Sequence, residues 1–598
     1  MTEFIITPGQ AIQHWAASSP NAIALKAPGA GDISFLHLSI QIQQAADQLT
    51  TLGYGADHRL ALVLPQGILL ATALLSLTAC CPVLPVNAAW TAPEHSAIFK
   101  KAGISALVTL PNFGGAACSA AAQLDLPVIE LIPTGAMPTG FFNLSGSPAR
   151  KPDTTRMQPY SLTLIMPTSG TTGSIKLVPV SGLQVVTSAS YSVEVMQAGS
   201  HDSTIIFGSL NHLAVITFCL LATIVSGGCA VIAPFDPLSA IQHIAQYRPT
   251  WLFTSPPVLH ELYEYLRTHP IPSAFKTMRF IRVSTAPFPT EKIVELERWL
   301  GIPVLQTYGM TEGIANNICN PLPPRVRKPE TVGLPVHLEA AVFNEEGQQL
   351  PTGVVGELAM RGENIFKGYL NPEDNIPSPF MDSWFMTGDL ATIDSDGYVT
   401  IVGRHKEMIN SGGMKILPRE VEDACMSHPD VAEASVVPLP HPTLGEHVAA
   451  AVIRRSDTLT EDDLHRYLKT RLAVYKIPGM ICFLDSIPKS PTGKVERRQV
   501  IDLLQAQNST RPVLDSNAET ASKLASAILT MWHEVLSNPG ITLLDQFILA
   551  GGDSLTAVRL AGMISESCGV DFSVLDIFDF PSPSSQAAEI NHRVNPIL

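Results

Sequence analysis

A run of hydroxyls and glycines with one lysine has the chemistry of a polyphosphate site. Residues 168–176 read TSGTTGSIK and follow the apolar, strand-like run 162–166. Gly170 and Gly173 let backbone N–H groups turn inward, the hydroxyl side chains add donors, and Lys176 supplies a positive charge. The spacing excludes a Walker A loop, because no Gly-Lys-Ser/Thr follows where one is required. Taken alone, the stretch also fits a Ser/Thr/Gly-rich surface turn.

A second group of residues that could carry chemistry is 551–555, which read GGDSL. We expect a helix over residues 555–565 with Ser554 at its N-cap. An exposed hydroxyl there could hold a phosphate close to the positive end of the helix dipole. The alternative is an ordinary N-cap serine after a Gly-Gly turn.

Up to about residue 400, strand-like runs alternate with helical patterns. The run 59–64 precedes the apolar stretch 68–81, and the run 229–233 follows the apolar stretch 213–225. This alternation predicts an α/β domain whose parallel sheets are covered by helices. Both apolar stretches fall short of the ~20 residues that span a bilayer, so we interpret them as buried helices.

The remainder of the chain changes character twice. Residues 403–504 predict a small α+β unit, with helices at 418–428 and 461–472 and strands at 431–438 and 448–453. Residues 505–520 are polar, contain proline and lack periodicity, which predicts a linker. Apolar side chains at helical spacing then predict an all-α domain. The predicted divisions are 1–402, 403–504, 505–520 and 521–592.

Composition narrows the partners and the compartment. The chain has 38 Lys+Arg against 53 Asp+Glu, a net charge of -15 that argues against nucleic acid or an anionic membrane as main partner. Its nine cysteines form no C-x-x-C pair and no cluster at zinc spacing, which favours reduced thiols. The N-terminal segment lacks the pattern of a signal peptide. We expect a cytoplasmic protein without a membrane span.

The motifs together resemble the adenylate-forming superfamily, which includes acyl-CoA synthetases, aryl-acid ligases and nonribosomal peptide synthetase adenylation domains. Six motifs occur in the family's order over about 330 residues. Besides the hydroxyl-rich loop, they are residues 283–289, 308–312, 386–390, 403–416 and 488–494.

The resemblance implies a role for each motif. Residues 283–289 would pack on adenine, Tyr308 would stack on it, Thr311 would contact the phosphate and Glu312 would help to hold Mg²⁺. The residues that the resemblance assigns to ATP or AMP are Thr168, Ser169, Gly170, Thr171, Thr172, Gly173, Lys176, Ser284, Thr285, Ala286, Tyr308, Gly309, Met310, Thr311, Asp389, Arg404 and Lys494.

Four residues of the later motifs complete the expected site. Asp389 and Arg404 would bind the ribose, Lys406 would act as the hinge residue, and Lys494 would be the catalytic lysine. A carboxylate that attacks the α-phosphate of ATP is repelled by it, and Mg²⁺ at Glu312 together with Lys494 would offset the developing charge. The expected catalytic set is therefore Lys494, Thr311, Glu312 and His212. One departure is Ile175, where the family often has proline, but no donor is lost there.

The GGDSL segment resembles the attachment site of acyl and peptidyl carrier proteins. In that family the serine, here Ser554, carries 4′-phosphopantetheine through a phosphodiester bond. Residues 578–583 resemble the family's turn before its last helix. The resemblance implies an all-α, four-helix carrier domain. It also implies a phosphopantetheinyl transferase acting in trans and a downstream enzyme that accepts the acyl group from the carrier.

The segment 207–212 bears on the acid that is activated. Adenylation domains for α-amino acids usually carry an acidic residue here, but no carboxylate occurs between Phe207 and Pro234. A buried substrate ammonium without a counter-charge is costly, so we predict a carboxylic acid without an α-amine. The segment resembles acyl- and aryl-CoA synthetases, which places His212 and Met310 in the acyl pocket. A core histidine at a helix start is the alternative for His212.

Three functions compete. The first is an adenylation–carrier didomain that makes acyl-AMP and loads its own carrier for another protein, since no condensation, reductase or thioesterase domain is visible. The second is an acyl-CoA ligase that uses free coenzyme A and has an accessory carrier. The third is a degenerate scaffold, against which the intact Glu312, Asp389, Arg404 and Lys494 argue.

Overall fold

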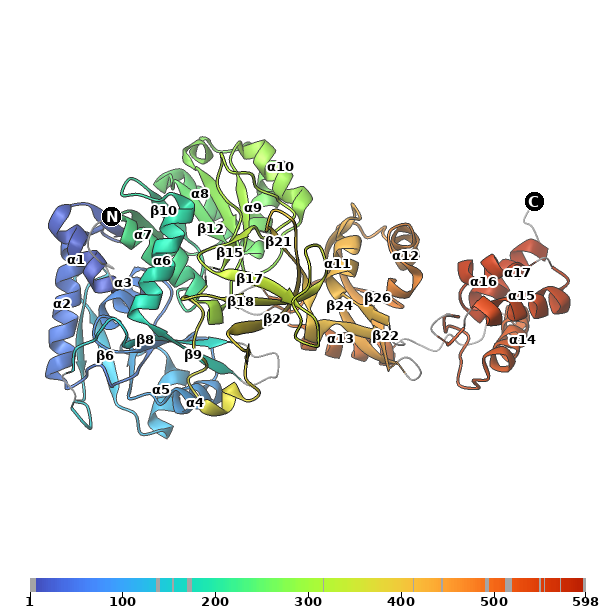
Figure 1. The fold of residues 1–598 in the computed structure, drawn as a ribbon, viewed down its shortest axis with the longest axis horizontal. Helices are drawn as coiled ribbons and strands as arrows, with labels where there is room; N and C mark the ends of the chain where they lie inside the picture. Colours follow the sequence, from blue (N-terminus) through green and yellow to red (C-terminus); the bar gives the residue numbers. More distant parts are fainter. Residues whose placement is uncertain are drawn as a thin grey trace. The chain divides into compact units, whose positions relative to one another are not determined.

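The computed structural model describes residues 7–135, 140–152, 155–168, 175–315, 317–411, 414–441, 445–489, 494–510, 519–547, 550–552, 554–570 and 572–594. The described chain divides into two compact units. The first comprises Met1–Ile401 with Thr492–Lys494, and the second comprises Val402–Pro491 with Val495–Leu598. Figure 1 colours the first unit mainly blue to yellow and the second orange to red.

The largest sheet of the described first unit has a parallel centre, as the alternating pattern predicts. Its parallel strands are buried apolar runs that pack helices on both faces. In spatial order the strands are β16 (Leu334–Pro335), β15 (Ile318–Cys319), β14 (Val304–Tyr308), β13 (Phe280–Val283), β12 (Trp251–Thr254), β10 (Ser203–Ile206), β11 (Cys229–Ile232), β1 (Ile23–Lys26) and β2 (Ile33–Ser34).

Two further sheets complete the strands of this unit. One is parallel except at its edges and has the order β7 (Phe142–Gly146), β6 (Val128–Pro133), β5 (Ala106–Thr109), β3 (Leu60–Val63), β4 (Val83–Pro85), β8 (Leu162–Thr168) and β9 (Lys176–Ser181). The other is antiparallel and has the order β17 (Glu339–Phe343), β18 (Gly356–Arg361), β20 (Trp384–Ile393) and β19 (Phe380–Met381), with β21 (Val399–Arg404) paired to β20.

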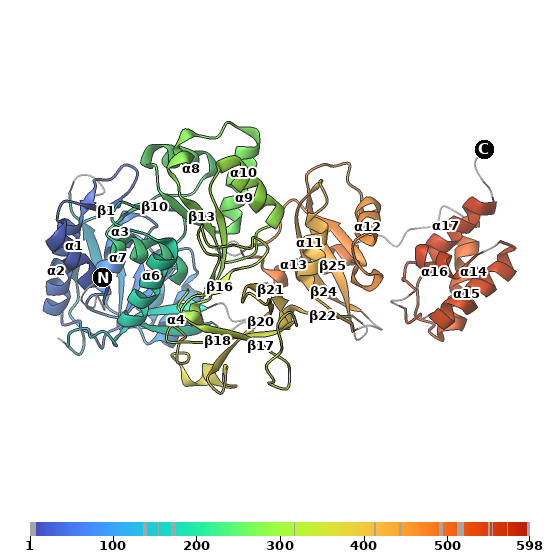
Figure 2. The same ribbon diagram turned by 45° about the horizontal axis from the view of Figure 1, so that its top comes forward.

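Helices form layers on both faces of the two parallel sheets. The inner layer is α1 (Pro8–Ser18), α2 (Phe35–Thr51), α3 (Ile68–Leu77), α6 (Gly182–Met196) and α7 (Ala222–Ser226), which share one core with both sheets and gather together in Figure 2. The outer helices are α8 (Pro237–Tyr247), α9 (Pro256–Thr268) and α10 (Thr290–Leu300) on the largest sheet, and α4 (Ala92–Ala102) and α5 (Gly115–Gln123) on the second. The core therefore lies between the sheets.

The two apolar stretches are buried, as expected, but the second is not a regular α-helix. A π-helical segment, η1 (Val215–Leu221), precedes α7, and all its residues are buried. A π-helix is rare and is often found at functional sites. No helix among the described residues is long and apolar enough to cross a membrane. The nine cysteines are free thiols, as expected.

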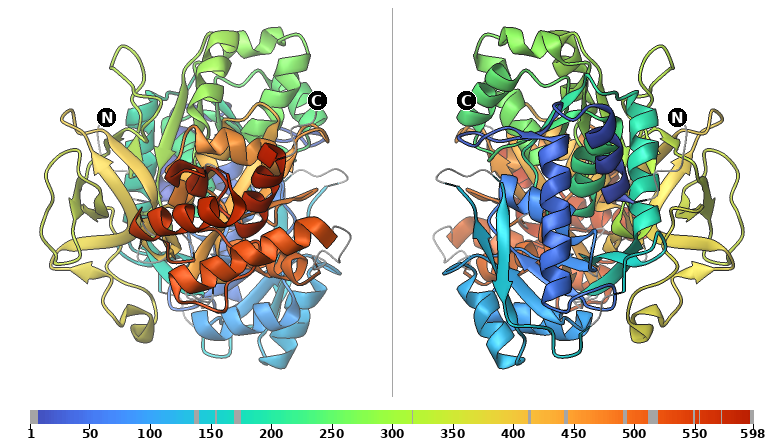
Figure 3. Two further views of the ribbon diagram at one scale, coloured as in Figure 1. Left: turned by 90° about the vertical axis from the view of Figure 1, so that its right-hand side faces the viewer. Right: turned by 90° about the vertical axis from the view of Figure 1, so that its left-hand side faces the viewer.

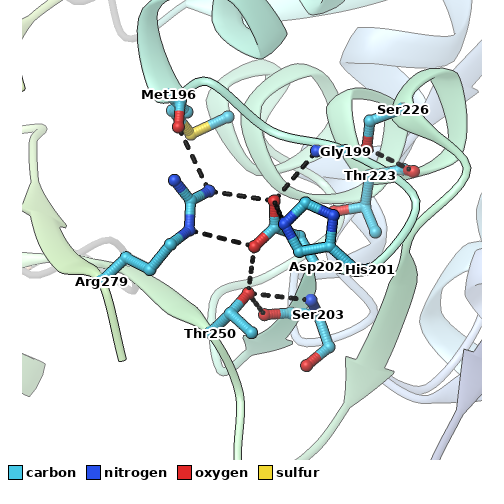
Figure 4. A network of polar contacts seen from close by, with 9 residues as sticks. All are labelled: Met196, Gly199, His201, Asp202, Ser203, Thr223, Ser226, Thr250 and Arg279. Carbon is cyan, nitrogen blue, oxygen red and sulfur yellow. Dashed lines mark hydrogen bonds and ion pairs between the residues drawn. The ribbon is translucent and has the colours of Figure 1, made fainter. Parts of the chain in front are cut away.

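A buried acid ties together three parallel strands at their amino ends (Figure 4). Asp202, 2% exposed, accepts hydrogen bonds from Arg279 Nε at 3.1 Å and Nη2 at 2.9 Å. It also accepts from Thr250 Oγ1 at 2.6 Å and from Gly199 N at 2.9 Å. Asp202, Thr250 and Arg279 directly precede β10, β12 and β13. The network thus fixes the relative positions of these strands.

The second unit begins with an α+β part. Its strands are β23 (Met414–Ile416), β22 (Ile409–Ser411), β25 (Gly445–Arg454), β24 (Val431–His441) and β26 (Met480–Phe483), and its helices are α11 (Pro418–Met426), α12 (Glu461–Lys469) and α13 (Arg497–Thr510). Helix α13 extends to Thr510, well into the stretch that the sequence predicts as linker. Buried Val500 and Leu504 anchor it, and the helix continues through the polar residues that follow.

The C-terminal part is all-helical, as predicted. It consists of α14 (Glu519–Leu536), α15 (Ser554–Cys568), α16 (Val574–Asp579) and α17 (Pro583–Val594), seen in red in the left view of Figure 3. Buried Trp532 of α14 donates from Nε1 to Gln586 Oε1 of α17 at 2.9 Å, which joins the first and last helices. Helix α15 begins at Ser554, so this serine occupies the first helical position and not the N-cap that we expected.

Candidate active site

The carboxyl ends of neighbouring parallel strands carry two of the expected motifs. β13 ends at Val283, so Ser284, Thr285 and Ala286 follow it directly, and β14 ends at Tyr308. In open α/β sheets, ligands bind beyond this edge. The Asp202 network lies at the opposite ends of the same strands, so binding and anchoring are separated along them.

The loop after β13 holds a strained threonine. Thr285 has φ +80°, which is unusual for a β-branched residue. Its buried Oγ1 has no hydrogen-bond partner among the described residues, whereas the Ser284 hydroxyl donates to the Thr307 carbonyl at 3.3 Å. Strain and an unsatisfied polar atom together are typical of a functional site.

Tyr308 and Asp389 meet although 81 residues separate them. The Tyr308 hydroxyl donates to Asp389 Oδ2 at 2.6 Å, and Asp389 is only 5% exposed. Asp389 lies in β20 after Gly388, whose φ of +74° favours glycine and whose N–H donates to Glu357 Oε1 at 3.0 Å. A buried, oriented carboxylate next to an aromatic ring suits a nucleoside, because the carboxylate can accept hydrogen bonds from both ribose hydroxyls.

The turn that contains residues 308–312 is held by Asn317. Its Oδ1 accepts from Met310 N at 3.1 Å and its Nδ2 donates to the Gly313 carbonyl at 2.8 Å. A Cβ on Gly309 would lie 1.6 Å from the Ala315 carbonyl oxygen, so this position requires glycine. Close backbone packing thus requires the glycine of this motif. Asn317 positions the turn and is a residue that we did not predict from the sequence.

Glu312 and Lys176 meet at Tyr369, a residue that we did not predict. The Tyr369 hydroxyl donates to Glu312 Oε1 at 2.9 Å, and the Lys176 ammonium lies 4.4 Å from the ring centroid. Glu312 is 8% exposed and lies with Thr311 in a short 3₁₀ turn, Thr311–Gly313. A carboxylate is a hard oxygen ligand of the kind that Mg²⁺ takes together with phosphates.

The hydroxyl-rich loop is described only at its ends. Thr168 closes β8 and pairs with Lys176, the first residue of β9, so the loop joins the ends of an antiparallel pair. Lys176 Nζ donates to the Asp374 carbonyl at 3.2 Å. The remaining expected ligands of this loop lie outside the described residues: Ser169, Gly170, Thr171, Thr172 and Gly173.

His212 is half-buried and precedes the π-helical segment η1. Burial, followed by the positive charge of Lys494, lowers the pKa of His212 to about 4. The imidazole is therefore neutral at pH 7 and can donate or accept a hydrogen bond without adding charge. Lys494 itself is exposed.

Arg404 and Lys406 belong to the second unit. Arg404 ends β21, and Lys406 lies exposed in the 3₁₀ turn His405–Glu407.

The turn before Ser554 requires its two glycines: Gly551 has φ +94°, and a Cβ on Gly552 would lie 2.4 Å from the ring of buried Phe547. Glycine at both positions therefore places Ser554 at the start of α15. The Ser554 side chain lies outside what the structure describes.

Three family models match consecutive parts of the chain. An AMP-binding enzyme model matches residues 12–370, its C-terminal domain model residues 420–494, and a phosphopantetheine attachment site model residues 526–590. A probable CoA ligase of Humulus lupulus is 33% identical over 81% of this chain and 94% of its own length. An oxalate–CoA ligase of Arabidopsis thaliana is 31% identical over 82% of this chain and 97% of its own length.

The fold also matches a solved structure. The crystal structure of ATP-bound MatB from Rhodopseudomonas palustris aligns with a TM-score of 0.75 and 26% identity, over 83% of this chain and 99% of that one. Enzymes of this kind activate a carboxylic acid with ATP, and Mg²⁺ is standard for them. The chain therefore belongs to the AMP-binding, adenylate-forming family of acid–thiol ligases and carries a phosphopantetheine attachment domain.

Proposed function

We propose that the chain activates a carboxylic acid without an α-amine as acyl-AMP and transfers the acyl group to phosphopantetheine on its own Ser554. The observation that carries this proposal is the fusion of an adenylating enzyme to a carrier domain in one chain. Only residues 511–518 separate α13 from α14. A tether of this kind raises the effective concentration of the thiol at the adenylating site.

In the first half-reaction, a carboxylate oxygen attacks the α-phosphorus of ATP and pyrophosphate leaves. Tyr308 would stack on adenine and Asp389 would hold the ribose, with Arg404 as a second contact. Glu312 would hold Mg²⁺, which neutralises phosphate charge, and Lys494 would stabilise the oxygens that gain charge. The buried carboxylates of Asp389 and Glu312 support these roles.

The remaining expected ligands lie around these groups. Ser284, Thr285 and Ala286 would line the adenine, and the unsatisfied Thr285 hydroxyl supports a ligand beside it. The segment 309–311 would lie beside the α-phosphate, and Met310 would also lie in the acyl pocket. The hydroxyl loop 168–173 and Lys176 would hold the outer phosphates.

The second half-reaction needs the small domain to reorient about Lys406, which would withdraw Lys494. The pantetheine sulfur then attacks the acyl carbonyl carbon, and AMP leaves with the bridging oxygen. A phosphopantetheinyl transferase must first modify Ser554, and a downstream enzyme would consume the thioester. We propose a cytoplasmic location for this pathway step.

Two observations support an acid without an amine. No carboxylate occurs between Phe207 and Pro234 to pair with an ammonium. Oxalate, the acid in the name of the Arabidopsis relative, also lacks an amine. His212 would lie close to the acyl carboxylate.

A second candidate acceptor is free coenzyme A. The relatives are named as CoA ligases, and their matched length accounts for the chain without its carrier domain. Competition distinguishes the two acceptors. Pantetheinylated protein is supplied with ATP, Mg²⁺ and an accepted acid while coenzyme A is titrated, and both thioesters are quantified. We expect carrier loading to persist at saturating coenzyme A and to vanish in Ser554→Ala, whereas complete diversion to acyl-CoA would favour the ligase.

A further inference from the structure

The segment 368–375, between β18 and β19, has its backbone fixed by one amide. Tyr369 N donates to Asn375 Oδ1 at 2.8 Å, and Asn375 Nδ2 donates back to the Tyr369 carbonyl at 3.1 Å. The same Nδ2 donates to the Asn371 carbonyl at 3.1 Å. The backbone from which the Tyr369 side chain projects is therefore set independently of any ligand.

The side chain of Tyr369 contacts two groups of opposite charge. Its hydroxyl donates to Glu312 Oε1 at 2.9 Å, and its ring faces the Lys176 ammonium at 4.4 Å. The Tyr369 hydroxyl is the donor in this hydrogen bond, because an ionised carboxylate can only accept. Phe366 N also donates to the Glu312 carbonyl at 2.8 Å, which fixes this residue at backbone and side chain.

Segment 368–375 also contacts the end of the hydroxyl-rich loop, at Lys176. Asp374 accepts from Lys176 Nζ through its carbonyl at 3.2 Å and pairs with Lys101 Nζ through its carboxylate at 3.0 Å. Lys101 Nζ also donates to the Ile175 carbonyl at 2.6 Å. Segment 368–375 is thus a common support for the loop end and for Glu312.

A phenol has an electrostatic advantage at this position. A basic side chain in place of Tyr369 would neutralise Glu312, and an acidic one would neutralise Lys176. A neutral hydroxyl orients the carboxylate and leaves its charge for a cation. A neutral π face holds the ammonium and leaves its charge for phosphates.

We propose that Tyr369 is a positioning residue for adenylation, which holds Glu312 through its hydroxyl and Lys176 through its ring. The proposal rests on the function proposed above, because it assumes that these two residues meet MgATP. Tyr263 is a matched control from another part of the unit: its hydroxyl donates to Glu295 Oε2 at 2.5 Å, and Lys292 Nζ lies 5.1 Å from its ring centroid.

Calorimetric titration of ATP at a series of Mg²⁺ concentrations tests the proposal without an acid substrate. Tyr369→Phe removes the hydroxyl and keeps the ring. We expect it to raise the Mg²⁺ concentration for half-maximal ATP affinity about 10- to 100-fold, the effect of one lost hydrogen bond to a charged group. Tyr369→Leu should also weaken ATP binding at saturating Mg²⁺, while Tyr263→Phe should match the wild type in both respects.

The outcomes separate this inference from the function on which it rests. An unchanged Mg²⁺ dependence in Tyr369→Phe, or an equal shift in Tyr263→Phe, would overturn the role of Tyr369. A wild-type protein that does not bind MgATP at all would overturn the proposed function and this inference with it. Tryptophan fluorescence of each variant verifies the fold, and Tyr369→Phe decides the matter even where Tyr369→Leu fails to fold.

Discussion

Replacing Asp202 with asparagine should destabilise the first unit and spare its chemistry. The change keeps the side-chain volume but removes the charge that two hydrogen bonds from Arg279 engage. Breaking a buried ion pair costs about 3–5 kcal/mol. The Arg279 side chain is 33% exposed, so water can solvate part of the stranded guanidinium. We therefore expect a loss of about 2–3 kcal/mol, which also matches the weakening of two charge-assisted hydrogen bonds.

Urea unfolding followed by tryptophan fluorescence measures this loss, because every tryptophan except Trp532 lies in the first unit. Asp125→Asn is the control from the same unit: its carboxylate pairs with Arg150 while 84% exposed, and its loss should cost less than ~0.5 kcal/mol. ATP–pyrophosphate exchange of folded Asp202→Asn at low temperature should stay within about threefold of the wild type, because Arg279 and Ser284 flank a four-residue strand and lie roughly 17 Å apart along it. An unfolding midpoint equal to that of the control would refute the reasoning, as would a large loss of exchange in the folded variant.

Three further results are expected. Asp389→Asn should lower kcat/KM for ATP about 10- to 100-fold in pyrophosphate exchange, since a hydrogen bond to a charged group contributes roughly 1.5–3 kcal/mol; an unchanged value would remove Asp389 from the nucleotide site. Burial lowers the pKa of His212 and of His447 to about 4, with Lys494 and His441 as the second causes. The unfolded chain then binds more protons between about pH 4 and 6.5, so the urea midpoint should fall as the pH drops through this window, and a midpoint at pH 5 equal to that at pH 7 would contradict this. Gly552→Ala should destabilise the carrier by about 1–3 kcal/mol through its clash with Phe547 and slow the modification of Ser554. Gly562→Ala meets open space within α15, so this control should not destabilise the carrier. Equal modification rates in the two variants would contradict the prediction.

Most of the fold could be predicted from the hydrophobic periodicity of the sequence. Buried parallel strands and covering helices produce runs such as 229–233 that can be recognised locally. The end of α13 could not be recognised, because its last residues are polar and their helicity depends on the packing of Val500 and Leu504 against the sheet. The π-helical form of η1 was likewise invisible, since an apolar run has no signature that separates π from α geometry.

Some residues of the candidate site could be predicted from the sequence, and others could not. Motif glycines could be identified because backbone approach forbids any side chain, as at Gly309 beside the Ala315 carbonyl. Tyr369 and Asn317 could not, because their contacts with Glu312 and Met310 form in the folded chain and follow no motif spacing of their own. The available signal was weak: a Gly-Tyr pair in a polar loop, and a buried asparagine after a turn.

The most direct test of the account is the intact mass of the pantetheinylated protein after incubation with ATP, Mg²⁺ and a panel of acids. The panel should hold short-chain, fatty, aryl and α-amino acids. We predict a mass gain equal to one acyl group, with an acid that lacks an α-amine, that disappears in Ser554→Ala. No gain with any acid, together with ATP turnover once coenzyme A is added, would contradict self-loading, and a gain with α-amino acids would contradict the account of the acid site.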